Sequence, residues 1–482
     1  MKNVLFASSE AIPFFKSGGL GDVAGVLPRY IRCPAYRIRA IMPKFRQIPK
    51  EYAEKMEYIA SFEVPLGWRR SYCGLFRLKY KGILWYFLDN EYYFFREKAY
   101  GEYDDAERMA FFSKAILESI PYLDFDVDIL HCNDWHTAMA PVFLREHYQH
   151  LEQYRKIKTV FTIHNLKFQG QYDPFILGDI LGLEDTPAAP QLLTWRDGKR
   201  ESVNYMQGAV CYADRITTVS PTYSEEIRMP YYGEHLDWLF QKRSNVLSGI
   251  LNGIDTEDLD PAKDPALPYH YDRSDLSGKA KNKKALQKEL GLEEDPSVPV
   301  YAIISRLTEQ KGLDLVTYIL PELEKRKMQL VILGVGDSKY EEAFRDYSAR
   351  NPGRIAACLC FDEPLSRRIY AGADALLVPS RFEPCGLTQM MAMRYGTLPI
   401  VRETGGLKDT VEPYNEYEGT GTGFSFANFN ADELLSAIDL SIKAYADPAM
   451  WKKLCGNAME KDFSWNRAAK EYRKLYRELY HS

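Results

Sequence analysis

The chain has 482 residues, more than one hydrophobic core usually organises, so its length predicts two domains. Hydrophobic residues make up 46% and charged residues 27% of the chain, which is ordinary for a soluble globular protein. A net charge of -5 and an isoelectric point near 6.0 argue against a nucleic-acid partner. No apolar run approaches the roughly 20 residues that span a membrane, so no membrane partner is expected either.

The first half of the chain alternates predicted strands with predicted helices. An apolar strand over 2–9 leads into the glycine-rich segment 16–22 and then into a helix that starts near Asp22. Residues 61–95 alternate apolar and polar positions and contain many aromatic side chains, which predicts inserted antiparallel hairpins. Apolar residues at three- and four-residue spacing predict a helix over 104–120. The other strands predicted in this half are 36–42, 127–132, 159–164, 215–219 and 246–251.

A second run of strands follows a polar segment, 255–295, which is rich in Asp, Lys and Pro. Its strands are short, apolar and followed by loop or helix signals, which favours parallel sheets with right-handed crossovers. The last predicted helix, about 466–480, is charged and amphipathic. We therefore predict an α/β protein with two doubly wound domains, whose ligand lies in the cleft between them. The strands predicted in this half are 300–305, 329–333, 355–361, 375–379 and 398–401.

The first motif with a chemical meaning is Lys16-Ser-Gly-Gly-Leu-Gly-Asp22, between a predicted strand and a predicted helix. Gly18 and Gly19 permit positive φ and close backbone approach, and the start of the helix offers free N–H groups to an anion. Lys16 adds a positive charge beside them. The spacing matches neither Gly-x-Gly-x-x-Gly nor a Walker loop, which argues against NAD and ATP. A plain strand-to-helix turn remains the alternative.

The second motif is Ser305-Arg-Leu-Thr-Glu-Gln-Lys-Gly312, which sets two cations, Arg306 and Lys311, in one loop after a strand. A diphosphate leaving group needs its charge neutralised as its bond to a sugar breaks, and Arg and Lys provide this without a metal. The motif therefore predicts a diphosphate site, with a solvated charged loop as the alternative.

The third motif is Pro379-Ser-Arg-Phe-Glu-Pro-Cys-Gly-Leu-Thr388, again after an apolar strand. Glu383 projects from a turn stiffened by Pro and Gly, and Gly386 to Thr388 start a helix whose N–H groups can hold phosphate. A carboxylate near sugar hydroxyls and N–H donors near a diphosphate are what a nucleotide-sugar site requires.

Two further segments, Asn133-Asp-Trp-His136 and Thr162-Ile-His-Asn165, place polar groups at the ends of strands, where Trp135 could stack on a sugar ring. Asp124-Phe-Asp-Val-Asp128 has the Asp-x-Asp spacing of metal-dependent glycosyltransferases, but we interpret it as a cap on the entry of the next strand. The chain lacks His-Glu-x-x-His and Gly-x-Ser-x-Gly motifs, so zinc and serine hydrolysis are unsupported.

Eight cysteines without a Cys-x-x-Cys pair are interpreted as reduced core thiols, with Cys358 and Cys360 on one face of a strand. The short apolar run after the N-terminus does not resemble a signal peptide. Both observations predict a cytoplasmic protein.

Taken together, the motifs resemble those of bacterial glycogen synthases and plant starch synthases, in the order of that family and over nearly the whole chain. The resemblance implies a GT-B fold of two Rossmann-like domains. It also implies transfer of glucose from ADP-glucose to the non-reducing end of an α-1,4-glucan such as glycogen, with retention and without metal or cofactor. The motifs are Lys16-Ser-Gly-Gly-Leu, Asn133-Asp-Trp-His, Ile163-His-Asn, Leu251-Asn-Gly-Ile-Asp255, Arg306-Leu-Thr-Glu-Gln-Lys-Gly, Arg381-Phe-Glu-Pro-Cys-Gly-Leu-Thr and Thr404-Gly-Gly-Leu.

The resemblance also implies a division of the chain. It predicts an acceptor-side domain over 1–250 with hairpins at about 61–95, a nucleotide-sugar domain over 251–464, and a terminal helix, 465–482, that crosses back to the first domain.

Site residues follow from the same motifs. The resemblance implies that Glu383 contacts the donor glucose, that His164 lies beside the anomeric carbon, and that Arg306 and Lys311 bind the diphosphate, so these four are the predicted catalytic residues. The predicted donor-binding residues are Lys16, Gly18, Gly19, Asn252, Arg306, Lys311, Phe361, Glu383, Cys385, Gly386, Leu387 and Thr388, and the predicted acceptor-binding residues are Glu10, Asp22, Asp134, Trp135, His136 and Asn165.

The chain departs from the family pattern at a few positions. Phe361 stands where the family usually has a tyrosine against adenine, Ser17 replaces threonine, and Met391 occupies the place of a second Glu found in many retaining GT-B enzymes. No residue is placed as a covalent nucleophile, so we predict front-face displacement. Two alternatives stay open: a retaining transferase that uses UDP-glucose or is of the sucrose type, and a catalytically silent glucan-binding scaffold.

Overall fold

The computed structural model describes residues 1–196 and 199–480. The chain divides into two compact units. Unit 1 contains Met1–Val219, Ser224–Ile250 and Trp465–Ser482, and unit 2 contains Ser220–Tyr223 and Leu251–Ser464. The chain therefore passes from one unit to the other several times, and its last helix belongs to the first unit.

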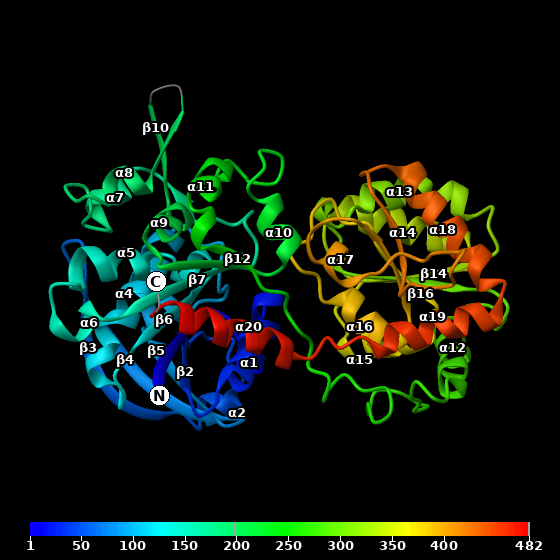
Figure 1. The fold of residues 1–482 in the computed structure, drawn as a ribbon, viewed down its shortest axis with the longest axis horizontal. Helices are drawn as coiled ribbons and strands as arrows, with labels where there is room; N and C mark the ends of the chain where they lie inside the picture. The colour runs from blue at the N-terminus through cyan, green and yellow to red at the C-terminus, as the bar shows by residue number, and fades with distance from the viewer. Residues whose placement is uncertain (197–198, 481–482) are drawn as a thin grey trace. The chain divides into compact units, whose positions relative to one another are not determined.

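Among the described residues, unit 1 is built on a nine-stranded sheet with the strand order β12-β11-β7-β6-β1-β2-β5-β4-β3 (Figure 1). The strands from β12 to β5 pair in parallel, and nearly all residues of the central strands β1, β6 and β7 are buried, as in strands covered on both faces. The strands are β1 Lys2–Ala7, β2 Tyr36–Pro43, β3 Glu57–Leu66, β4 Arg69–Tyr80, β5 Ile83–Asp89, β6 Ile129–Asn133, β7 Lys158–Ile163, β11 Arg215–Thr218 and β12 Leu247–Gly249.

The hairpins predicted over 61–95 are the antiparallel strands β3, β4 and β5. They begin at Glu57 and extend the main sheet, because β5 pairs in parallel with β2. A small antiparallel sheet of β8 Gln171–Tyr172, β9 Leu193–Arg196 and β10 Lys199–Asn204 was not predicted from the sequence.

Helices of unit 1 cover the sheet, and the terminal helix α20 (Trp465–Glu478) is part of its core. Trp465, Tyr472 and Tyr476 of α20 are buried, and the Tyr476 hydroxyl lies 2.6 Å from Nδ1 of His131 on β6. The predicted helix 104–120 is α4, Asp105–Ser119. The other helices of unit 1 are α1 Gly19–Ile31, α2 Lys50–Ala53, α3 Glu91–Phe94, α5 Met139–Phe143, α6 Glu152–Arg155, α7 Ile176–Asp179, α8 Ala189–Leu192, α9 Tyr205–Tyr212 and α11 Asp237–Lys242. Helix α10, Pro221–Glu226, belongs to unit 2 up to Tyr223 and to unit 1 from Ser224.

Unit 2, in the part of the chain that the structure describes, has a six-stranded parallel sheet with the order β15-β14-β13-β16-β17-β18. Its strands are β13 Val300–Ile304, β14 Gln329–Leu333, β15 Ile355–Cys358, β16 Ala375–Val378, β17 Leu398–Arg402 and β18 Phe424–Phe426. Its helices are α12 Ser277–Glu289, α13 Leu313–Leu323, α14 Ser338–Arg350, α15 Glu363–Gly372, α16 Thr388–Arg394, α17 Gly405–Thr410, α18 Ala431–Tyr445 and α19 Pro448–Glu460. Parallel sheets flanked by helices in both units confirm the predicted fold class.

Several predicted strand ends differ from the observed ones by one or two residues, and the largest difference is at the end of β15. Strand β15 stops at Cys358 instead of continuing to residue 361, because the N–H of Cys360 donates to the carbonyl of Cys358 in a tight turn. Cys360 is exposed, so the prediction that both thiols lie on one strand face in the core is wrong for Cys360. All eight cysteines are free thiols.

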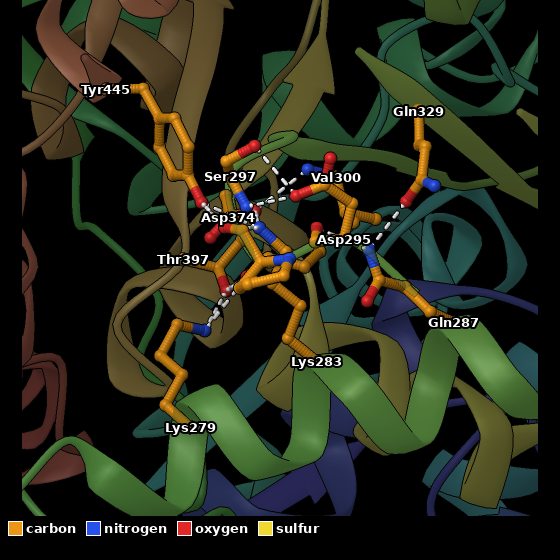
Figure 2. Close-up of polar contacts among 12 residues, drawn as sticks. Lys279, Lys283, Gln287, Asp295, Ser297, Val300, Gln329, Asp374, Thr397 and Tyr445 are labelled. Carbon is orange, nitrogen blue, oxygen red and sulfur yellow. Dashed lines mark hydrogen bonds and ion pairs between the residues drawn. The ribbon is translucent and has the colours of Figure 1, made fainter. Parts of the chain in front are cut away.

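Helix α12 lies in the polar segment 255–295, in which no helix was predicted from the sequence. Buried lysines hold the helix in place (Figure 2). Nζ of Lys279 donates to Thr397 Oγ1 and to the carbonyls of Tyr370, Ala371 and Ala373 at the end of α15. A cation is favourable at the C-terminal end of a helix, where carbonyls lack partners. Burial nevertheless lowers the pKa of Lys279 to about 8.

Lys283, one turn further along α12, pairs with Asp374 at 2.7 Å, and its Nζ also donates to the Tyr445 hydroxyl. Asp374 accepts the N–H of Val300 as well, at the first residue of β13. The two lysines therefore attach a polar helix to the rest of unit 2 by charge-assisted hydrogen bonds, in addition to the apolar contact of the buried Leu286.

Candidate active site

In unit 1 the polar residues that follow β6 and β7 are in contact, since neighbouring parallel strands end at the same edge of the sheet. The backbone N–H of His164 donates to Oδ1 of Asp134 at 2.7 Å. Nε2 of His164 lies 2.9 Å from Oδ1 of Asn133. Asn165 follows directly and is half-buried. The two segments singled out in the sequence therefore form one cluster.

The protonation state of His164 follows from its neighbours. Nδ2 of Asn133 donates to the carbonyl of Ala7, so Oδ1 of Asn133 is the atom that faces the imidazole and can only accept. His164 therefore carries its proton on Nε2. Burial lowers the pKa of His164 to about 3, so the ring is neutral near pH 7 and contributes a dipole, not a charge.

Asp134 is buried and has a backbone conformation that side chains rarely adopt, with φ 55° and ψ 179°. Such conformations cost about 1–3 kcal/mol and occur most often at functional sites. Burial raises the pKa of Asp134 from 3.8 to about 7. Between pH 3.8 and about pH 7, the Asp134 carboxyl is protonated in the folded protein but ionised in the unfolded chain. Stability therefore falls by about 4 kcal/mol as pH rises from about 4 to about 7, and stays at that level above it.

The glycine-rich turn before α1 is anchored by Glu10. Its carboxylate accepts the backbone N–H groups of Ser17 at 2.7 Å and Gly18 at 3.1 Å, and the Ser17 hydroxyl at 2.6 Å. Lys16 pairs with Asp22 at 2.6 Å. Glu10 and Asp22, predicted to line the acceptor side, are thus both engaged with this turn.

The turn differs from the prediction in where the helix starts. Helix α1 begins at Gly19, three residues earlier than predicted, and Gly18 has φ -157°. The positive φ that Gly18 and Gly19 permit is not adopted at either residue. A Cβ atom at either glycine would meet no atom within 4 Å, so folding does not require their small size. The glycines leave an open space beside the first N–H groups of a thirteen-residue helix.

Trp135 and His136 form an aromatic cluster with Tyr100. The Trp135 and His136 rings lie 4.2 Å apart, and the Tyr100 ring lies 4.5 Å from His136. Nδ1 of His136 is buried and has no hydrogen-bond partner within the described residues. Tyr100, whose hydroxyl donates to Ser9, was missed by the sequence analysis because nothing distinguishes it from the other aromatic residues of its region.

In unit 2 the second and third motifs meet at an ion pair. Nζ of Lys311 lies 2.6 Å from Oε2 of Glu383, which also accepts the Ser380 hydroxyl at 2.9 Å. The close approach of the two loops requires Gly312, because a Cβ there would lie 1.9 Å from the carbonyl oxygen of Pro379. Ser380 was not predicted, although it lies inside the third motif.

Arg306, the other predicted cation, is exposed, and its guanidinium has no partner in residues 1–196 and 199–480. Phe361 is 82% exposed beyond the end of β15. A free guanidinium and a free ring face are groups that a nucleotide diphosphate can engage.

The end of the third motif turns sharply into α16. Gly386 has φ 72°, Leu387 precedes the helix, and Thr388 is its first residue. Cys385 is buried, and burial raises the pKa of its thiol to about 12. Oδ1 of Asn252 is buried and has no partner in the described part of the chain.

The structure thus places the predicted residues in two groups, one in each unit. The unit 1 group contains Glu10, Lys16, Gly18, Gly19, Asp22, Asp134, Trp135, His136, His164 and Asn165, and the unit 2 group contains Asn252, Arg306, Lys311, Phe361, Glu383, Cys385, Gly386, Leu387 and Thr388.

The Asp-x-Asp segment lies outside both groups. Asp128 accepts the N–H of Asn3 and pairs with Lys2, so it joins the entries of β6 and β1 as predicted. Among the residues that the structure describes, no group of three or more His, Cys, Asp or Glu side chains could hold a metal ion. Every helix within these residues is too short or too polar to cross a lipid bilayer.

The fold and the site together define a glycosyltransferase of the GT-B class. Sucrose-phosphate synthase from Thermosynechococcus elongatus has the same fold, with a TM-score of 0.62 at 16% identity over the whole of both chains. The model of the starch synthase catalytic domain matches residues 3–242, and that of the glycosyl transferases group 1 matches residues 282–454.

Full-length relatives narrow the class to one family. The chain is 50% identical to glycogen synthase of Lachnospira eligens over 482 residues, 99% of this chain and 100% of that one. It is 49% identical to glycogen synthase of Geobacillus stearothermophilus over 99% of this chain and 97% of the relative. The catalytic domain of starch synthase IV from Arabidopsis thaliana, bound to ADP and acarbose, superposes with a TM-score of 0.91 at 32% identity over 100% of this chain and 99% of that one. The chain belongs to the glycogen and starch synthase family.

Proposed function

We propose that this chain extends α-1,4-glucans by transferring glucose from ADP-glucose to their non-reducing ends in glycogen synthesis. The observation that carries the proposal is the 50% identity with a glycogen synthase over essentially all of both chains. The starch synthase of the same fold that binds ADP and acarbose, a nucleotide and an oligosaccharide analogue, supports the choice of donor and acceptor.

Unit 2 is proposed to bind the donor. The exposed ring of Phe361 takes the adenine face, and Arg306 and Lys311 bind the diphosphate, helped by the backbone from Gly386 to Thr388. Glu383 then accepts hydrogen bonds from the glucose hydroxyls. Lys311 holds Glu383 by an ion pair in the structure, so diphosphate binding adds a second anion to the same ammonium group.

Unit 1 is proposed to hold the acceptor and the anomeric side of the donor. Trp135 offers a ring to a sugar, and Lys16 with the open space at Gly18 and Gly19 offers positive charge and free N–H groups to the diphosphate.

The reaction is proposed to proceed with retention, by attack of the acceptor hydroxyl on the face that ADP leaves, without a metal. Cations supply the charge that the leaving ADP needs, each such donor being worth about 2–4 kcal/mol of barrier. His164 is neutral, so we assign it a dipolar contact with the sugar and not a proton-transfer role. The free cysteines support a reducing, cytoplasmic location.

The test is to incubate the protein with glycogen and either ADP-glucose or UDP-glucose, with and without EDTA, and to measure nucleotide release, chain length and the anomeric configuration of the new linkage. We expect elongation with ADP-glucose, a new α-linkage and no effect of EDTA. Elongation with UDP-glucose alone would reject the donor, and a folded protein that elongates with neither would be a glucan-binding scaffold.

A further inference from the structure

Helix α10 (Pro221–Glu226) is shared between the two units. Ser220–Tyr223 belong to unit 2, whereas Ser224–Ile250 belong to unit 1. The first turn of this six-residue helix is therefore attached to one unit and its end to the other.

The attachment in unit 2 is made by one carboxylate, that of Asp409 on α17. Its Oδ2 accepts the backbone N–H of Thr222 at 3.0 Å, and its Oδ1 accepts the Thr222 hydroxyl at 2.6 Å. Ser220 accepts the next N–H, that of Tyr223, at 3.0 Å. Because the first N–H groups of a helix have no partner within the helix, a carboxylate there both satisfies a donor and faces the positive end of the helix dipole.

The other end of α17 supports the segment that carries Glu383. The N–H of Gly406 donates to the carbonyl oxygens of Glu383 and Pro384, each at 3.2 Å. A Cβ at Gly405 would lie 1.9 Å from the Glu383 carbonyl oxygen, and one at Gly406 would lie 2.1 Å from that of Cys385. The backbone of α17 thus rests directly on the third motif, about one helical turn from Asp409.

We infer that Asp409 is a positioning residue, which joins the first turn of α10 to the backbone of Glu383 through the single turn of α17. The inference rests on the proposed function, because Glu383 is there assigned to the donor glucose. Asp409 itself touches no substrate. Its loss releases the start of α10 and allows α17 to shift, so the Glu383 carboxylate loses its fixed distance to the donor.

A set of variants tests this link. Asp409→Ala removes both hydrogen bonds, Thr222→Val removes only the one from the hydroxyl, and Thr222→Ser keeps both. Lys408→Ala changes an exposed residue of the same helix and is the matched control. We expect Asp409→Ala to lower kcat about tenfold, Thr222→Val to lower it less, and Thr222→Ser and Lys408→Ala to leave it unchanged.

Comparison of the Kd for ADP with kcat distinguishes a positioning role of Asp409 from general damage to the fold. We expect the Kd for ADP alone, measured by calorimetry, to rise by a clearly smaller factor than kcat falls, because ADP lacks the glucose that Glu383 contacts and keeps its contacts with Arg306 and Lys311. The double variant Asp409→Ala/Thr222→Val should be no slower than Asp409→Ala, since the hydroxyl has lost its acceptor already. Additive losses, or a Kd for ADP that rises in proportion to the fall in kcat, would overturn the inference.

Hydrogen exchange provides a readout that does not need activity. Asp409→Ala should speed amide exchange in 220–226, in 403–410 and in 380–387. Faster exchange in 220–226 alone would show that Asp409 is a local helix cap and would overturn the inference. If the wild-type protein does not elongate glucan, the proposed function fails; if it does and Asp409→Ala is fully active, the inference alone fails.

Discussion

Lys311→Ala is the sharpest test of the candidate site, because its effect on stability can be calculated from the structure. Nζ of Lys311 lies 2.6 Å from Glu383, and the two side chains are 20% and 8% exposed. At an effective dielectric constant of about 20 the attraction of two charges at this distance is about 6 kcal/mol, most of it offset by desolvation. Removal of Lys311 leaves the Glu383 carboxylate buried without a cation, which costs about 3–5 kcal/mol. Because Ser380 still donates a hydrogen bond to Glu383, we expect the free energy of unfolding to fall by about 3 kcal/mol.

The activity of the same variant has a separate cause. Loss of a cation that stabilises the leaving diphosphate should raise the barrier by about 2–4 kcal/mol, which lowers kcat between about 30-fold and 1,000-fold. Adding Glu383→Gln should restore most of the stability, since the uncharged amide needs no cation and its oxygen still accepts from Ser380. It should not restore kcat.

Unfolding in urea gives the stability, and nucleotide release from ADP-glucose with glycogen gives kcat. Lys325→Ala is the matched control, because Lys325 and Glu322 also lie 2.6 Å apart but with side chains 68% and 44% exposed. The control should change neither quantity measurably. The reasoning on burial is refuted if both lysine variants lose the same stability, and the role of Lys311 is refuted if kcat stays within about threefold.

The remaining predictions concern single positions of unit 1. Gly19→Ala should leave the melting temperature unchanged or slightly higher but raise KM for ADP-glucose at least about tenfold, whereas Gly25→Ala, whose Cβ would lie 2.4 Å from Ile12, should lower the melting temperature. Asp134→Asn should be more stable than wild type to urea at pH 8 by a few kcal/mol at most, because the ionisation that burial opposes is gone, and this gain should shrink at pH 5. His235→Gly should raise the unfolding free energy by about 1 kcal/mol, since His235 has φ 67°.

Each of these predictions has a clear contrary result. An unchanged KM for Gly19→Ala would show that no ligand approaches this turn. A stability gain in Asp134→Asn that is the same at pH 5 and pH 8 would exclude ionisation as its cause. A less stable His235→Gly would mean that the entropy of glycine in the unfolded chain outweighs the relieved strain.

Most parallel strands of the two large sheets were predictable because they are short runs of apolar residues that are covered on two faces, but the three-residue strand β18 was not predicted. The prediction extended β15 to residue 361, because Cys360 and Phe361 are apolar, and local composition does not reveal a turn made by backbone hydrogen bonds. Helix α12 was missed for the opposite reason. Its buried face carries Lys279 and Lys283, whose partners lie about 90 residues away in the chain.

In the candidate site, too, the motifs predicted the residues, but only the fold decided their contacts. The sequence identified Lys311 and Glu383 by their motifs, yet their ion pair joins residues 72 positions apart and depends on the close contact of two loops at Gly312. Gly18 and Gly19 permit positive φ and close backbone approach, and the structure shows ordinary backbone angles with an open space beside them. Glycine in a sequence indicates freedom of the backbone, but not which use the fold makes of it.

The sequence by itself determined the class of fold, the succession of most strands along the chain and the residue types of the site, because hydrophobic periodicity and short motifs are local properties of the chain. The family followed from the same motifs. Only the tertiary structure decided which charges are paired, that Asp134 and His164 are buried with shifted pKa values, and that Asp409 joins α10 to the Glu383 segment. These features depend on distance and on the exclusion of water, which arise only when segments far apart in the chain pack together.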